Sequence, residues 1–324
     1  MTLEWQGIPA STAIIVPFKD GFESLGRCLA SVLNGLPDGM RIVVIDDGSA
    51  NDPSSAAALA ALITHPAIVW RLHARNRGPA AARNTGLDWC WGHGVDTVIL
   101  LDSDCLAPAD FVQRHLAHHH VHPEALCIGG AIEGRGDGFW ARLDGILSWF
   151  TSVPRPDCEV NPPLHLPTTN MSLKLRRRCR ELLRFDARLR TGEDVALFRD
   201  LRRGGEIVRF TSFPRIVHVD RATFRAVLRH QYRWGLHTFA VRFGRASGSH
   251  ALRLAFVLAF IPFAPAYAAL GTWLNMRLWL AYRRRDWPLV PVVFLAYLVK
   301  AVAVVHGALA PGAALYPDAG AGVR

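Results

Sequence analysis

Three short acidic motifs carry residue types that could do chemistry. The sequence DDGS occupies positions 46–49, DSD occupies 102–104, and TGED occupies 191–194. Carboxylates that follow a strand can accept hydrogen bonds from a nucleotide base or a ribose. Two carboxylates separated by one small residue can hold a divalent cation beside a diphosphate. An aspartate of the third motif could act as a general base that takes a proton from a hydroxyl group.

Each motif also has an ordinary structural explanation when it is taken alone. An Asp-Gly pair is common in turns because glycine permits a tight backbone. A D-x-D sequence can be a surface turn, and acidic residues stabilise the N-terminus of a helix. The elements that carry the motifs, and the order of the motifs along the chain, must therefore decide between these explanations.

Runs of aliphatic and β-branched residues predict four strands, and two of the motifs follow such runs directly. The predicted strands are 12–18, 41–45, 68–72 and 96–101. Segments 23–34 and 79–91, and an alanine-rich stretch that ends at Ile63, are predicted as helices. Strands that alternate with helices indicate an α/β fold with a mostly parallel sheet flanked by helices. Ligands bind at the carboxyl edge of such sheets, where the first two motifs are expected.

The middle of the chain is less regular. Segment 154–167 is rich in proline and is predicted to be a loop. Segment 191–203 is predicted to be a helix, with Thr191 as its cap and acidic residues in its first turn. A basic helical stretch is predicted from 221 to about 245.

Two long apolar segments distinguish the C-terminal region. Residues 254–274 contain no charged side chain, and this segment is long enough for a helix that crosses a bilayer. Residues 287–317 contain one charged side chain, that of Lys300. Between them, 276–286 alternates aromatic or aliphatic residues with arginine, which is typical of an interfacial helix or a snorkelling loop. The sequence therefore predicts a hydrophobic helical membrane region at the C-terminal end.

The composition combines basic and apolar character. The 324 residues include 50% hydrophobic and 20% charged residues, with a formal net charge of +10. This composition excludes a disordered chain, a collagen, a coiled coil and a small disulfide scaffold. The combination favours contact with an anionic bilayer, and we expect no nucleic-acid partner. The six cysteines form no C-x-x-C pair and are expected to be reduced, and the N-terminus does not have the pattern of a signal peptide.

The order of the motifs resembles the family 2 glycosyltransferases, which have the GT-A fold. The resemblance covers roughly residues 12–245. The matching segments are IIVPF at 14–18, VVIDDGS at 43–49, NRG at 76–78 with ARNTG at 82–86, LLDSD at 100–104, NMS at 170–172 and GEDVALFRDLRRGG at 192–205. Each segment is modest alone, but six segments in this order and spacing are specific.

The resemblance implies a metal-dependent, inverting transfer of a sugar from a nucleotide sugar, most often a UDP-sugar. Asp102 and Asp104 would hold Mg²⁺ or Mn²⁺ at the diphosphate, and Asp194 would be the catalytic base. His218 could complete the metal shell, although a histidine of the core is an equal alternative. The residues expected to bind the nucleotide sugar are Pro17, Asp46, Asp47, Arg77, Arg83, Asp102, Arg233 and Trp234.

Segment 230–235, HQYRWG, is similar to the Q-x-x-R-W segment of membrane polysaccharide synthases in this family, with His230 where Gln or Arg is usual. Arg233 could pair with a diphosphate and Trp234 could stack on a sugar ring. An amphipathic helix packed on the catalytic domain is the alternative.

Two further clusters of residues each have a structural and a functional explanation. The histidines at 115, 118, 119 and 122 fall on one helix face and could bind zinc. No nearby cysteine or acid completes such a site, so we expect none. The basic run 174–190 is either a solvated helix or a contact for anionic lipid or a lipid-linked phosphate acceptor.

Topology poses a conflict. Nucleotide sugars are cytosolic, so a hairpin that crosses the membrane twice would place arginines 283–285 outside, against the positive-inside rule. Either Pro262 and Pro265 break the first segment into a re-entrant or in-plane element, or the basic charge of 221–253 overrides the turn. We predict a GT-A catalytic domain at 1–220, a basic amphipathic helical segment at 221–250 and a membrane-associated hairpin at 251–324, with the catalytic domain cytoplasmic.

These expectations describe an enzyme of envelope glycan synthesis that transfers one or a few sugars to a lipid-linked or polysaccharide hydroxyl acceptor. A transferase that acts on a polyprenyl phosphate is an alternative, because its acceptor already carries a charged oxygen and needs little general base. A catalytically silent scaffold of a polysaccharide-synthesis complex is a third possibility. The presence of all the main acidic positions favours an enzyme.

Overall fold

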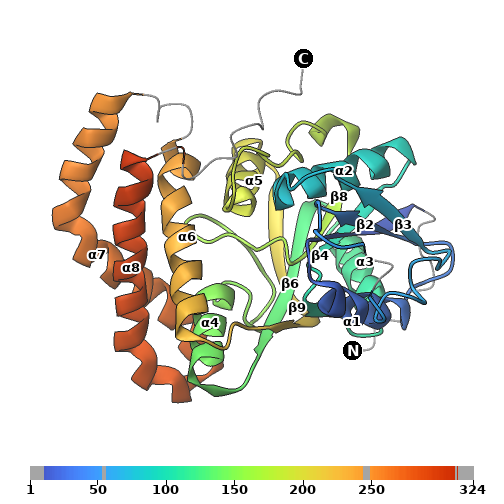
Figure 1. Cartoon of the computed structure of the whole chain (residues 1–324), viewed down its shortest axis with the longest axis horizontal. Coiled ribbons are helices and arrows are strands. Elements are labelled where there is room, and N and C mark those ends of the chain that lie inside the picture. Colours follow the sequence, from blue (N-terminus) through green and yellow to red (C-terminus); the bar gives the residue numbers. More distant parts are fainter. Residues whose placement is uncertain (1–10, 53–55, 244–248, 311, 313–324) are drawn as a thin grey trace. The chain divides into compact units, whose positions relative to one another are not determined.

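The computed structural model describes residues 11–52, 56–243, 249–310 and 312 (Figure 1). The chain divides into two compact units, which are described separately below. The first unit comprises 1–133, 154–185 and 197–218, and the second comprises 134–153, 186–196 and 219–324, in each case where residues are described. The division into 1–220, 221–250 and 251–324 stays a prediction, and the end of its last segment lies outside the described residues.

A parallel half-sheet forms the N-terminal part of the first unit. Its strands are β1 (Thr12–Phe18), β2 (Arg41–Asp46), β3 (Ile68–Leu72) and β4 (Thr97–Leu101). They lie in the order β3-β2-β1-β4, and all three pairings are parallel. Strands β1 and β4 are buried along their whole length, as β-branched and aliphatic strands inside a parallel sheet should be. The four predicted strands and the parallel sheet are confirmed.

A second half-sheet extends the first beyond β4. It contains β5 (Cys105–Leu106), β6 (Ala125–Arg135), β7 (Cys158–Glu159), β8 (Asn170–Lys174) and β9 (Ile207–Val219). Strand β8 lies between β4 and β6 and pairs antiparallel with both. β5 and β7 both pair antiparallel with β9. This half was not predicted, because its pairings join segments that are far apart in the sequence.

The first unit contains the helices α1 (Phe22–Leu33), α2 (Pro79–Gly92) and α3 (Phe111–Val121). The predicted alanine-rich helix before Ile63 is wrong. Residues 57–64 form consecutive turns, with bonds such as Leu59 N to Ala56 O at 2.9 Å, while 53–55 lie outside the described residues. These turns pack closely on α1, where a Cβ on Gly26 would meet the Ala58 carbonyl oxygen at 2.7 Å.

Two histidines of α3 belong to the core. His115 and His119 are buried, and their Nε2 atoms lie 3.0 Å from Asn170 Oδ1 and 2.9 Å from Ser172 Oγ of β8. Burial lowers the pKa of His115 to about 3, and it also lowers the pKa of His119 well below its usual value. These imidazoles are therefore neutral side chains that attach α3 to the sheet.

The second unit is helical. It contains α4 (Gly138–Trp149), α6 (Phe224–Phe243), α7 (His250–Tyr282), the short 3₁₀ segment η4 (Arg284–Leu289) and α8 (Val290–Leu309). Helix α5 (Glu193–Arg203) begins in this unit and continues into the first. Figure 1 shows α6, α8 and α7 side by side, with α8 in the middle. Side chains of α4, α6, α7 and α8 share one apolar cluster that includes Ile146, Val227, Met276 and Val293.

The C-terminal helices match the predicted apolar region, but not in detail. Helix α7 continues through Pro262 and Pro265, so the alternative in which these prolines break the segment is wrong. Both prolines are exposed. Residues 276–282 are the last turns of α7 rather than a separate interfacial element. By length and composition, the stretches 250–282 and 284–309 could each cross a membrane.

Candidate active site

Polar residues of the first unit gather where the parallel strands end. Pro17 lies in β1 beside Ile45 of β2, and Asp46 is the last residue of β2. Asp47 follows it, and Asp102 follows β4. Because parallel strands place their carboxyl ends at one edge of the sheet, the first two acidic motifs share this edge, as predicted.

Asp47 holds the segment that follows β3. Its Oδ1 lies 2.7 Å from His73 Nδ1 and accepts the backbone N–H of Arg77 at 2.9 Å. Its Oδ2 accepts the N–H of Gly78 at 2.7 Å. The other ring nitrogen of His73 lies 2.9 Å from Thr85 Oγ1 on α2. Asp47 and His73 are both buried, so they fix the loop before α2.

Asp46 closes the turn that carries the DDGS motif. The backbone N–H and the hydroxyl of Ser49 donate to Asp46 Oδ1 at 2.8 and 2.7 Å. Gly48 has a φ of +71°, and a Cβ there would lie 2.5 Å from the backbone of Arg75. Only glycine therefore fits between this turn and the loop after β3.

Arg83 and Asp102 form a largely buried ion pair. The Arg83 Nη2 atom donates to Asp102 Oδ1 at 2.7 Å, and the Arg83 side chain is 5% exposed. The other carboxylate oxygen of Asp102 accepts the hydroxyl of Thr169 at 2.7 Å. The ion pair offsets the cost of removing the Arg83 guanidinium from water. It also holds the partly exposed carboxylate of Asp102 in one orientation at this edge of the sheet. In contrast, the side chain of Arg77 is exposed.

Asp104 and His218 meet through the pairing of β5 with β9. Cys105 lies opposite His218 in that pairing, and Nε2 of His218 lies 3.2 Å from Asp104 Oδ2. An oxygen and an imidazole nitrogen suit a divalent cation that takes its other ligands from phosphate and water. In the part of the chain that the structure describes, no three His, Cys, Asp or Glu side chains come together as a metal site.

The predicted base belongs to the second unit. Asp194 is partly exposed in the first turn of α5, and its Oδ1 accepts the N–H of Val195 at 2.7 Å. The preceding Gly192 has a φ of +79°. The hydroxyl of Thr191 lies 2.7 Å from His237 Nδ1 of α6. The start of α5 is therefore attached to α6 by the residue that was predicted to cap it.

Arg233 and Trp234 lie on α6, with Arg233 exposed and Trp234 half-buried. The Nζ atom of Lys300 on α8 lies 5.4 Å from the centre of the Trp234 ring, which is cation–π distance. Lys300 also lies within electrostatic reach of Asp194. On the other side, the ring of His230 lies 4.2 Å from that of Trp234, and His230 Nδ1 lies 3.2 Å from the buried Asp144 Oδ1.

The predicted site residues thus form two groups, one in each unit. The first contains Pro17, Asp46, Asp47, Arg77, Arg83, Asp102, Asp104 and His218, and the second contains Asp194, Arg233 and Trp234. The sequence interpretation missed His73, Thr169 and the role of Lys300. His73 follows a predicted strand directly, and Lys300 is the one charged residue of α8, so both carried a signal. Thr169 carried none, because the strand that follows it was not predicted.

Comparison with known proteins decides the family. A model of the family described as glycosyl transferase family 2 matches residues 13–181, more than half of the chain. The chain belongs to glycosyl transferase family 2. The matched range contains the DDGS and DSD motifs, whereas Asp194, His218 and the 230–235 segment lie beyond it.

Relatives of this family 2 glycosyltransferase include another glycosyltransferase and a protein of succinoglycan biosynthesis. A pre-mycofactocin glycosyltransferase of Mycobacterium tuberculosis is 27% identical over 220 residues, which are 65% of this chain and 43% of the relative. The succinoglycan biosynthesis protein ExoO of Rhizobium meliloti is 26% identical over 68% of this chain and 64% of its own length. The family 2 glycosyltransferase therefore spans less than half of the first relative and less than two thirds of the second.

The fold of the family 2 glycosyltransferase also has solved counterparts. A crystal structure of residues 1–349 of S. aureus TarS matches with a TM-score of 0.50 and 14% identity, over 93% of this chain and 91% of that one. This likeness supports the fold alone. Together with the family match it confirms the GT-A fold and the resemblance that the ordered motifs predicted.

Proposed function

We propose that this family 2 glycosyltransferase transfers a sugar, with inversion, from a UDP-sugar to a hydroxyl group of a lipid-linked or polysaccharide acceptor. The observation that carries the proposal is the arrangement at the carboxyl edge of β2 and β4. Asp47 fixes the loop before α2, and Arg83 fixes Asp102 at the end of β4. A pre-organised edge of this kind suits a nucleoside diphosphate, whose base and phosphates need several fixed partners.

Each residue of the first unit has a defined task in this proposal. The turn closed by Asp46 and Ser49 borders the nucleotide base and ribose, with Pro17 below it in the sheet. The exposed guanidinium of Arg77 pairs with the diphosphate. Arg83 acts through its ion pair with Asp102, so that the carboxylate keeps one orientation.

Asp102, Asp104 and His218 would hold the divalent cation, Mg²⁺ or Mn²⁺. The contact between Asp104 and His218 supplies an oxygen and a nitrogen donor, and the exposed part of Asp102 supplies another oxygen. When bound, the cation would neutralise the charge of the leaving nucleoside diphosphate. The same carboxylates would otherwise repel that charge.

Asp194 acts as the general base. The acceptor oxygen bonds to the anomeric carbon from the face opposite the leaving group, while the bond from that carbon to the phosphate oxygen breaks with its electron pair. Asp194 removes the acceptor proton in the same displacement. Its place at a helix N-terminus, within electrostatic reach of Lys300, favours the carboxylate form that a base requires.

The acceptor and the location follow from the second unit. Trp234 offers a ring on which a sugar can stack, and Arg233 offers a charge to a phosphate. We place the enzyme at the cytoplasmic face of a membrane, because nucleotide sugars are cytosolic and two helices are long and apolar enough for a bilayer. The similarity to ExoO, a protein of succinoglycan biosynthesis, supports an envelope glycan as the product.

Two measurements test this function. A thermal-shift screen of nucleotide sugars, with and without Mg²⁺ or Mn²⁺, should single out a UDP-sugar, because a ligand of the native state raises its stability. The anomeric configuration of the product, read by NMR, should be inverted. A retained configuration, or no stabilisation by any nucleotide sugar, would contradict the proposal. If Asp194→Asn still glycosylates a polyprenyl phosphate at the wild-type rate, the alternative acceptor is correct.

A further inference from the structure

The N-terminal half of α7 is an open apolar surface. Most buried residues of α7 lie between Ala268 and Trp279, whereas Val257 is the one buried residue within 250–267. The exposed large apolar side chains of α7 are Leu252, Leu254, Leu258, Ile261, Phe263, Leu270 and Trp273, each at least 44% exposed. A surface of this size on a folded unit marks a contact with a protein or a membrane.

The hairpin turn is fixed to α4. Asp286 of η4 is completely buried and forms an ion pair with Arg142 of α4, and it accepts the indole N–H of Trp279 at 2.6 Å. One turn earlier on α7, the side-chain amide of Asn275 donates to the Ile146 carbonyl oxygen of α4 at 3.1 Å. The turn between α7 and α8 therefore stays beside α4.

Helix α8 is fixed along α6 in the same way. A Cβ on Gly235 of α6 would lie 2.4 Å from the Lys300 carbonyl oxygen, and one on Gly307 of α8 would lie 2.0 Å from the Leu236 carbonyl oxygen. The hydroxyl of Tyr232 lies 2.6 Å from His306 Nδ1. The two backbones are thus in close contact over much of their length.

This packing opposes a hairpin that crosses the bilayer. Helix α6 carries four exposed arginines, Arg225, Arg229, Arg233 and Arg242. If α8 crossed the hydrocarbon core, α6 would have to cross beside it and take these charges along, and arginine is among the most costly side chains to place there.

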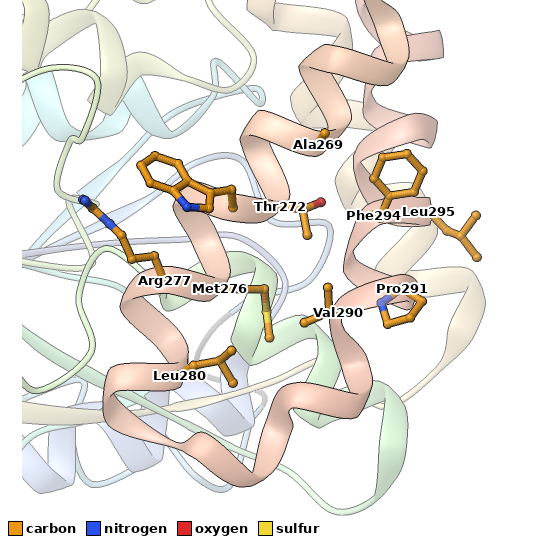
Figure 2. Close-up of a pocket in the computed structure, with 10 residues that line it drawn as sticks. Ala269, Thr272, Met276, Arg277, Leu280, Val290, Pro291, Phe294 and Leu295 are labelled. Atoms are coloured by element: carbon orange, nitrogen blue, oxygen red, sulfur yellow. The ribbon is translucent and has the colours of Figure 1, made fainter.

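The margin of the open surface suits lipid headgroups. Arg277 is exposed, with its guanidinium 4.9 Å from the Trp273 ring, and Arg284 and Arg285 are exposed in the turn next to the exposed Trp287. Arginine and tryptophan together are typical of the membrane interface. Figure 2 shows a groove between α7 and α8 that is lined by Arg277, Leu280, Val290 and Phe294, among others. The volume of this groove is about 790 Å³.

We infer that the α7–α8 hairpin binds one leaflet of an anionic bilayer in-plane and does not cross it. The exposed apolar surface of α7 lies among the upper acyl chains, the groove of Figure 2 receives parts of those chains, and the arginines contact phosphates. The tri-arginine turn then stays on the same side of the membrane as the rest of the second unit. This arrangement removes the conflict with the positive-inside rule, although α7 is unbroken.

Vesicle binding tests the surface. The full chain is mixed in detergent with phosphatidylcholine vesicles, with or without phosphatidylglycerol, and floated after detergent removal. Leu258→Glu/Phe263→Glu should bind about tenfold less than wild type. The matched control Leu72→Glu/Val121→Glu introduces the same charge at exposed apolar positions of the first unit and should bind normally. Equal loss in both variants, or no preference for phosphatidylglycerol, would overturn the inference.

Sided labelling tests the in-plane arrangement. Arg284→Cys in the turn and Asp38→Cys, an exposed position of the first unit, are treated with a membrane-impermeant maleimide in inside-out membrane vesicles and in intact spheroplasts. The native cysteines are buried apart from the half-buried Cys158, so wild type gives the background. Both variants should react only in inside-out vesicles. Labelling of Arg284→Cys in spheroplasts would show that the hairpin crosses the membrane.

Discussion

The two units of the molecule place their polar groups by different means. In the first unit, the ends of parallel strands bring Asp46, Asp47 and Asp102 to one edge, and backbone N–H groups and a buried arginine fix them there. In the second unit, Asp194, Trp234 and Lys300 come from three helices and interact through side chains. The comparison teaches that the donor side of the proposed reaction depends on backbone geometry, whereas the acceptor side depends on helix packing.

The largest effect should come from the second unit. Asp194→Asn removes the proposed base, so we expect the rate of UDP release from the best UDP-sugar, in the presence of membranes as the source of acceptor, to fall about 10²–10⁴-fold. Asp200→Asn is the matched control, because it removes an exposed carboxylate from the same helix. Similar rates for the two variants would show that α5 does not supply the base.

The next effect tests the backbone geometry of the first unit. Gly48→Ala must accept a left-handed backbone and also displace the backbone of Arg75, so we expect a loss of about 3 kcal/mol in the free energy of unfolding. Gly39→Ala has a similar φ of +79° but no neighbour within 4 Å, and should lose only about 1 kcal/mol. Urea unfolding of both variants gives the difference, and equal losses would show that the Arg75 contact does not matter.

A smaller effect tests the core of the first unit through its pH dependence. The pKa of His115 falls from 6.5 to about 3 on folding, because the ring is buried. Below pH 6.5 this histidine is therefore protonated in the unfolded chain but stays neutral in the folded chain. The free energy of unfolding decreases as the pH falls from 6.5 towards 3. Between pH 7 and pH 5 this loss amounts to about 2 kcal/mol.

The control for this pH dependence lies on the same helix. Replacing the histidine, as in His115→Asn, should remove its share of the pH dependence of urea unfolding. His120 is exposed on α3, so His120→Asn should leave the change of the free energy of unfolding with pH as it is in wild type. Equal slopes for wild type and His115→Asn would mean that His115 is protonated in the folded state.

The smallest effect tests side-chain contacts in the second unit. Asp144 is buried; burial alone would raise its pKa, but the hydrogen bond from His230 and the charge of Arg221 outweigh burial and lower it. His230→Leu removes one of these partners and should cost about 1–2 kcal/mol in thermal unfolding at neutral pH. His230→Gln, which keeps a side-chain donor, should cost less. Equal costs would show that the contact with Asp144 is not a stabilising one.

The sequence interpretation succeeded where the signal was local. β-Branched runs gave β1–β4, and the acidic residues after them gave the edge of the sheet that carries the site. It failed where long-range packing decides. The antiparallel strands β6–β9 pair across large sequence separations, and residues 57–64 form turns where Ala58 lies against Gly26 of α1. The spacing of the α3 histidines does not reveal that His115 and His119 meet Asn170 and Ser172, because those partners lie on a distant strand.

The central claim is that the first unit binds the nucleotide and the second unit supplies the base. Calorimetric titration of UDP, in the presence of Mn²⁺, into two variants tests this claim most directly. Asp102→Asn changes the edge of the first unit, and Asp194→Asn changes the second. We expect Asp102→Asn to weaken UDP binding at least about tenfold, because a charge-assisted contact is lost, and Asp194→Asn to leave the Kd of UDP within about twofold of wild type. Undiminished UDP binding by Asp102→Asn, or an equal loss in Asp194→Asn, would contradict the account.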